Sequence, residues 1–179
     1  YKNLTTLISR GYQEGQRQGI PTIRLSWLEE LNEGLIALSG GRLGEIGISL
    51  ISGRRADAET SLKRLMAIFP DRFYLELQRT GRPDEEDYLH AAVDLADVFS
   101  CPLVATNDVR FIAAEEYEAH EARVCIYEGR TLDDPRRERR YSESQYIRSA
   151  EEMAELFFDI PEALENTLEI AKRCNLDLR

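Results

Sequence analysis

Apolar runs and helical apolar spacings alternate along the middle of the chain. Three strands are predicted: GLIALSG (34–40) and CPLVATND (101–108) are short apolar runs typical of buried strands, and FYLELQR (73–79) alternates well enough for a strand, with Phe73, Leu75 and Leu77 on one side. Between them, apolar residues three and four positions apart predict helices, one entered through GRLGEIGISLI (41–51) and others over 55–69 and 84–99. Pro70 ends the second helix, and Asp84 stands where it could cap the third. This alternation is typical of parallel α/β units.

The pattern changes after the third predicted strand. Residues 115–127 predict a helix, and the charged, irregular stretch GRTLDDPRRERRYSES follows it. Ser149 and Glu152 form a capping-box pattern before a short helix. Pro161 then opens a final helix, because proline fits the first helical position.

These patterns divide the chain into two predicted parts. Residues 1–113 predict part of an α/β barrel or sheet, and residues 114–179 predict a helical and looped tail. Because the first residue is Tyr1 and not methionine, we expect that upstream sequence is missing.

Composition narrows the classes of function. The 179 residues are 42% hydrophobic and 31% charged, which is typical of a soluble globular protein. The net charge of −10, from 23 basic and 33 acidic residues, argues against a broad nucleic-acid-binding surface. One basic cluster stands out, for which a solvated loop is the default interpretation and a contact patch for DNA or an acidic partner the alternative: Arg136, Arg137, Arg139 and Arg140.

Cysteines and histidines are few. The three cysteines are far apart and form no C-x-x-C pair, which favours reduced thiols in a cytoplasmic protein. Only two histidines occur, His90 and His120, and both lie within helical patterns. A metal centre built from several histidines therefore cannot be assembled from this chain alone.

Glycines gather after the first predicted strand, in SGGRLGEIG (39–47). Such glycines can cradle a phosphate at a helix N-terminus. The spacing matches neither G-x-G-x-x-G nor a P-loop ending in G-K-[ST], so a tight strand-to-helix turn is favoured.

Polar side chains also follow the other two strands. Glu76 and Gln78 should point to the same face of the second strand, and Asn107 and Asp108 end the third. Arg110, two residues after Asp108, offers only hydrogen-bond donors and repels a divalent cation. From the spacing alone, an ion pair between Asp108 and an arginine, or a plain turn, is favoured over a metal site.

Five separated strings resemble the polymerase-and-histidinol-phosphatase (PHP) domain family: ELNEGLIALSGGRLGEIG, FPDRFYLELQRTGRPDEE, PLVATNDVRF, TLDDPRR and IPEALENTLEIAKRC. More narrowly, they resemble the PHP domains of proteobacterial DNA polymerase III α subunits. The resemblance implies part of a distorted (β/α)7 PHP barrel, lacking its first strands and followed by a helical tail that leads toward the polymerase core.

Metal-binding members of this family carry a trinuclear centre, and two of its motifs fall in this chain. The resemblance places Thr80 where those members have a histidine, and Asp108 and Arg110 where they have an Asp-x-His motif. Threonine is a poor transition-metal ligand and arginine is not one. We therefore expect a degenerate site that binds no metal or other cofactor, no catalytic residue in this segment, and Arg110 filling the vacated position by pairing with Asp108 or another carboxylate.

The resemblance implies a structural role in DNA replication. The segment would brace the polymerase core and dock the proofreading exonuclease subunit, and it would meet other replicase subunits and DNA mainly through the rest of the α subunit. Nucleotidyl transfer, with its Mg2+, would take place outside this segment. Two alternatives stay open: an active metal-dependent phosphoesterase (a pyrophosphatase or proofreading nuclease), and an unrelated α/β protein that binds phosphate through residues 40–47.

Overall fold

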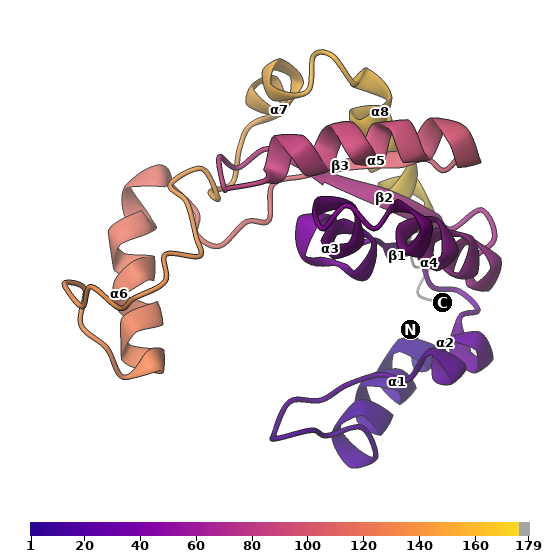
Figure 1. Cartoon of the computed structure of the whole chain (residues 1–179), viewed down its shortest axis with the longest axis horizontal. Helices are drawn as coiled ribbons and strands as arrows, with labels where there is room; N and C mark the ends of the chain where they lie inside the picture. The colour runs from indigo at the N-terminus through magenta and orange to yellow at the C-terminus, as the bar shows by residue number, and fades with distance from the viewer. Residues whose placement is uncertain (176–179) are drawn as a thin grey trace.

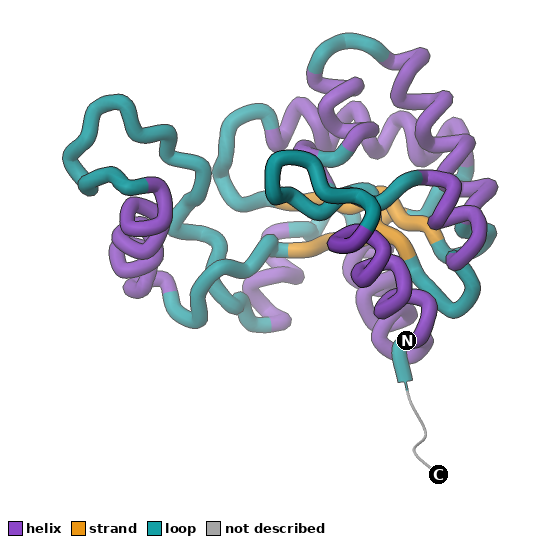
Figure 2. The backbone as a smooth tube through the Cα atoms, turned by 90° about the horizontal axis from the view of Figure 1, so that it is seen from below, coloured by secondary structure: helices purple, strands orange, loops and turns teal. Residues whose placement is uncertain are grey.

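Three parallel strands lie at the centre of the computed structural model, which describes residues 1–175 (Figures 1 and 2). Their order in the sheet is β1 (Ala37–Leu38), β2 (Phe73–Gln78) and β3 (Leu103–Thr106). In the register, Leu75 lies opposite Leu103 and Gln78 lies opposite Thr106. The carboxyl ends of β2 and β3 therefore meet at the same edge of the sheet.

Helices make the connections that parallel strands require. The 3-10 turn η1 (Gly41–Leu43) and the helices α3 (Glu45–Ile51) and α4 (Arg55–Ile68) link β1 to β2, and α5 (Glu85–Phe99) links β2 to β3. The other elements are α1 (Lys2–Gln13), α2 (Leu25–Leu31), η2 (Ala114–Glu116), α6 (Tyr117–Glu128), α7 (Ala150–Leu156) and α8 (Pro161–Arg173). Figure 1 shows α6 at one end of the molecule, away from the sheet. Within residues 1–175, no helix is long and apolar enough to cross a membrane.

The core forms around β2, because this strand is paired on both edges and covered on both faces. Leu75 and Leu77 are fully buried, and helix α5 packs Leu89 and Leu95 into the same cluster. Helix α8 runs along β3, and its Asn166 amide donates to the backbone oxygen of Leu103 at 2.8 Å. Burial of large aliphatic side chains of this kind contributes roughly 1.5–3 kcal/mol each, which fixes the sheet as the rigid part of the molecule.

Most sequence predictions for this region are confirmed. The second and third strands, the helices at 55–69 and 84–99, and the capping box of Ser149 and Glu152 are all present. The first strand is much shorter than predicted, because β1 pairs only with β2 and Gly40 leaves the extended conformation with a φ of 80°. The helices α1 and α2 were not predicted.

The predicted capping role of Asp84 is wrong. Asp84 occupies the N-cap position of α5, but its φ is 63° and its side chain makes no cap hydrogen bond. The left-handed backbone does not have the extended conformation that a capping side chain normally needs. Instead, the Glu85 carboxylate accepts hydrogen bonds from the turn that precedes the helix.

The α/β class is confirmed. The three described strands form an open parallel sheet, and no closed barrel is present within residues 1–175. The division of the chain at residue 113 stays a prediction.

Candidate functional site

Each of the three strands is followed by an arginine at its carboxyl end: Arg42 after β1, Arg82 after β2 and Arg110 after β3. Ligands of α/β folds bind at this end of the strands. The glycine-rich stretch after β1 forms a tight turn, in which a Cβ added to Gly44 would lie 1.8 Å from the Ser39 oxygen. Gly41, with a φ of 59°, lets the turn pack directly against the Gln78 side chain.

Arg82 is the buried centre of this region, with 7% of its surface exposed. Its Nε lies 2.9 Å from Glu85 Oε1, and its Nη1 lies 2.7 Å from Asp108 Oδ2. Its Nη2 donates to Gln78 Oε1 at 2.8 Å. One guanidinium therefore ties two strand ends and the start of α5 together through charge-assisted hydrogen bonds.

Thr80 and Glu85 form the second layer of contacts around Arg82. Thr80 is fully buried, and both its backbone nitrogen and its hydroxyl donate to Glu85 at 2.6 Å. Burial alone would raise the pKa of Glu85, but the hydrogen bonds from Thr80 and the Arg82 guanidinium outweigh it and lower the pKa. Thr80 thus stabilises a buried carboxylate, and its hydroxyl is already engaged.

Asp108 also forms an ion pair with a second arginine, Arg110. Arg110 Nη2 lies 2.8 Å from Asp108 Oδ1, and the guanidinium also lies 5.3 Å from the ring centre of Tyr141. Gln145 donates to Asp108 Oδ2 at 2.9 Å. The predicted ion pair between Arg110 and Asp108 is therefore present, but the Arg110 side chain is 41% exposed and Arg82 holds the buried position.

The other predicted pocket residues divide into two groups. Glu76 and Gln78 point to one face of β2, as their spacing predicts, and Gln78 Nε2 donates to Glu76 Oε1 at 3.0 Å. Asn107 instead donates to the backbone oxygens of Ser144 and Tyr146, at 2.9 and 2.7 Å. Its role is to tie the loop after α6 to the end of β3.

The basic cluster in that loop is largely neutralised. The side chain of Arg137 is buried and pairs with Glu121 at 2.7 Å. Arg136 pairs with Asp134 at 3.0 Å, and Arg140 pairs with Glu138 at 3.1 Å. Arg139 forms no ion pair within the described part of the chain. The four arginines therefore do not form one uncompensated patch.

The histidines take no part in a polar site. His90 is exposed on α5. His120 packs against the rings of Tyr141 and Phe111, with centroid distances of 4.7 and 5.6 Å. Among residues 1–175, no three or more His, Cys, Asp or Glu side chains are grouped so as to hold a metal ion.

The donor set at the strand ends does not fit a cluster of divalent cations. Both oxygens of the Asp108 carboxylate are already paired with guanidiniums, one from Arg82 and one from Arg110. A fixed positive charge beside a carboxylate opposes the binding of a metal ion. No step of a metal-dependent reaction follows from these residues.

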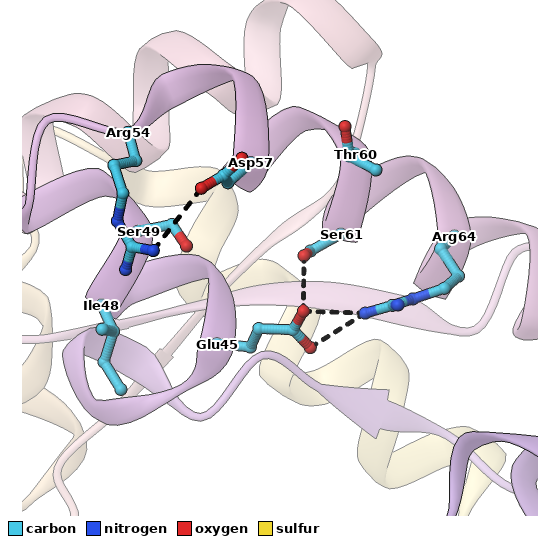
Figure 3. Close-up of a pocket in the computed structure, with 8 residues that line it drawn as sticks. All are labelled: Glu45, Ile48, Ser49, Arg54, Asp57, Thr60, Ser61 and Arg64. Carbon is cyan, nitrogen blue, oxygen red and sulfur yellow. Dashed lines mark hydrogen bonds and ion pairs between the residues drawn. The ribbon is translucent and has the colours of Figure 1, made fainter.

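A separate hollow of about 650 Å³ lies between α3 and α4 (Figure 3). Glu45 accepts there from Ser61 and Arg64, and Arg54 pairs with Asp57. Its lining comes from residues 45–64 alone, and its charged groups face one another. It therefore offers less for binding than the strand ends, where several loops meet.

Sequence reasoning missed Arg82 and Glu85. The available signal was local: Arg82 stands in the turn after β2, three residues before Glu85 in the first turn of α5. An arginine and a glutamate at this spacing lie close enough to pair. Their burial could not be foreseen, because it depends on the distant Asp108 and Gln145.

Comparisons with known proteins agree with the resemblance seen in the sequence. The PHP domain family model matches residues 1–80. Over all 179 residues, the chain is 62% identical to the DNA polymerase III subunit alpha of Pseudomonas fluorescens, 60% to that of Escherichia coli and 55% to that of Vibrio cholerae. The chain spans about 15% of the length of each of these relatives. Residues 1–80 thus match the PHP domain family, and the whole chain is similar to a segment of bacterial DNA polymerase III α subunits.

Proposed function

We propose that this chain is a non-catalytic structural module of a replicative DNA polymerase α subunit. It contributes the later part of a distorted (β/α)7 barrel, and ion pairs with arginines occupy the Asp108 carboxylate at the strand ends. The observation that carries this proposal is the buried Arg82, which bonds Glu85 and Asp108 at 2.9 and 2.7 Å.

The activity of the whole protein is part of the same proposal. Template-directed DNA synthesis, its Mg2+ and its contacts with DNA and other replicase subunits would reside in the remainder of a cytoplasmic α subunit. The match of all 179 residues to a segment of polymerase subunits supports this. The acidic balance of the segment, −10 overall, supports a contact with protein in preference to DNA.

The proposed absence of metal-dependent chemistry is argued from the positive charges beside Asp108. A metal-dependent hydrolase uses its ions to acidify water and to hold phosphate oxygens. Here Arg82 and Arg110 supply positive charge to Asp108 permanently, and neither can activate a water molecule.

An active phosphoesterase is the second candidate, because Asp108 is retained at the family position. Hydrolysis of a phosphodiester and of pyrophosphate by the full-length protein separates the two. A phosphoesterase would show hydrolysis that disappears both on addition of a chelator and in Asp108→Asn. We expect no such hydrolysis. Turnover that meets both conditions would establish the phosphoesterase and refute the structural proposal.

Docking of a proofreading exonuclease subunit is the proposed partner role. Helix α6 carries two neighbouring, highly exposed apolar residues, Ile126 and Tyr127, at 79% and 92% exposure. Figure 1 shows α6 well separated from the sheet, where a partner can reach it. Exposed apolar side chains of this kind favour a protein contact.

The test is binding of the exonuclease subunit to the full-length protein. We expect Ile126→Asp with Tyr127→Asp to weaken binding at least about tenfold, as for the loss of interface anchors. The matched control is Val98→Asp on α5, which changes a side chain of 63% exposure and should leave binding unchanged. Undiminished binding to an α subunit that lacks residues 1–179 would refute the docking role.

A further inference from the structure

The loop between α6 and α7 contacts the ends of two strands of the sheet. Its Ser142 hydroxyl donates to the backbone oxygen of Thr80, which follows β2. The segment after β3 joins the loop through the backbone, because the nitrogens of Arg110 and Phe111 donate to the Gln145 oxygen at 2.8 and 3.4 Å. This contact, here called the loop junction, consists of Thr80, residues 107–111 and residues 142–146.

Gln145 is the buried centre of the loop junction, with 0% of its surface exposed. Its Nε2 donates to the backbone oxygen and to Oδ2 of Asp108, both at 2.9 Å. Its Oε1 accepts from the Ser142 nitrogen at 3.0 Å. One end of the amide therefore binds the end of β3, and the other end binds its own loop. Such an amide fixes the groups that it joins, because each broken bond would leave a buried polar atom without a partner.

Asn107 supports the loop junction from the side of the sheet. Its Nδ2 donates to the backbone oxygens of Ser144 and Tyr146, at 2.9 and 2.7 Å. These two residues flank Gln145 in the chain. The loop is therefore held through its backbone by one side chain of the sheet and through the Gln145 amide by the next residue, Asp108.

Helix α6 is held by the same loop. The ring of His120 lies 4.7 Å from that of Tyr141, and the Tyr117 hydroxyl donates to the Tyr141 backbone oxygen at 3.3 Å. His120 also packs on Phe111, whose own nitrogen donates to the Gln145 oxygen. Since Figure 1 shows α6 away from the sheet, its position depends on how the loop is seated at the junction.

We propose that Gln145 is a positioning residue for partner binding, which sets where α6 presents Ile126 and Tyr127. This inference rests on the docking role proposed above and names the residue through which the sheet controls it. Gln145 cannot touch a partner, because it is fully buried. A change at this residue therefore alters the affinity for the exonuclease subunit while the contact surface keeps its side chains.

The test compares amide hydrogen exchange in variants of the full-length protein. Gln145→Met keeps the length of the side chain and removes its donor and its acceptor. Exchange should rise at least about fivefold in α6 and in residues 140–147, as expected when buried polar groups lose their partners, and should stay unchanged in β2. Ser144→Ala is the matched control and should change nothing, because Ser144 enters the junction through its backbone oxygen.

Binding of the exonuclease subunit is the second readout. Its Kd should rise roughly five- to tenfold in Gln145→Met, a change typical of coupling between separate sites, and stay unchanged in Ser144→Ala. Asn107→Ala removes the two bonds that hold the loop backbone and should act in the same direction. This second variant carries the test if Gln145→Met does not fold.

Three results would overturn the proposal. The first is unchanged exchange of α6 in both junction variants. The second is an equal rise of exchange in β2, which would give Gln145 a role in general stability instead. The third is normal exonuclease binding by the junction variants while Ile126→Asp with Tyr127→Asp weakens it, which would leave the docking role intact. Normal binding by that double variant as well would refute docking at α6 itself, and the positioning role would fall with it.

Discussion

The guanidinium of Arg82 donates to the carboxylate of Asp108 across 2.7 Å, although 26 residues separate them in the chain. This pair joins the end of β2 to the end of β3 at the edge of the sheet where ligands of α/β folds bind. Arg110 binds the other oxygen of Asp108 at 2.8 Å. Both oxygens of Asp108 are therefore paired with arginines of the protein itself.

Replacing Arg82 by alanine should destabilise the sheet strongly. Glu85 would remain buried without its cation, and breaking a buried pair in this way typically costs about 3–5 kcal/mol. Hydrogen exchange of the β2 and β3 amides measures this loss. Arg136→Ala, which removes an exposed and paired arginine, should leave the same amides unchanged. Equal protection in Arg82→Ala and the unmodified protein would contradict the network described above.

Thr80→Val should reveal that Thr80 acts as a hydrogen-bond donor. Valine keeps the volume but removes the hydroxyl that donates to Glu85, which should cost about 1–3 kcal/mol of local stability. Thr80→Ser keeps the hydroxyl and should cost less. The comparison uses the same amide exchange, and a serine variant less stable than the valine variant would argue that packing dominates at this position.

Lowering the pH should reduce the stability that the buried Glu85 carboxylate contributes. The hydrogen bonds to Glu85 lower its pKa below the ordinary value of 4.5 despite its burial, so the unfolded state binds more protons than the folded state in this range. The stabilisation is fully present above the ordinary pKa and is lost as the pH falls through the lowered one. Melting curves between pH 3 and 6 should show this loss, and Glu85→Gln should flatten it. A slope unchanged by that substitution would assign the acid sensitivity elsewhere.

Arg137 and its neighbour Arg136 provide a test within the basic cluster. Arg137 pairs with Glu121 in a buried contact and also reaches the Cys125 sulfur at 3.3 Å, whereas Arg136 is exposed. Arg137→Ala should speed amide exchange throughout α6, because it leaves Glu121 buried without its cation. Arg136→Ala should not. Similar exchange in the two variants would mean that the buried pair does not hold the loop to α6.

The sequence predicted the elements of the core but not the centre of the site. The strand around Leu75 was found from its alternating apolar residues, and the strand around Leu103 from a short apolar run that ends in polar residues. The edge strand β1 was predicted to be longer than it is, because an apolar run does not reveal how many neighbouring strands a strand pairs with.

The site was partly predictable for a related reason. The pairing of Glu76 with Gln78 follows from the two-residue period of a strand, and the pairing of Asp108 with Arg110 follows from their closeness in the chain. The contact between Arg82 and Asp108 depends on the register of β2 against β3. No spacing in the sequence expresses that register.

The metal content of the full-length protein tests the central claim most directly. The protein is produced with added zinc and manganese and dialysed without chelator, and its metal content is then measured by elemental analysis. The part of the zinc or manganese content that depends on Asp108 should be far below one equivalent per protein. The unmodified protein and Asp108→Asn should therefore contain the same amount. Stoichiometric zinc or manganese in the unmodified protein, lost in Asp108→Asn, would contradict the claim that arginines hold both oxygens of Asp108.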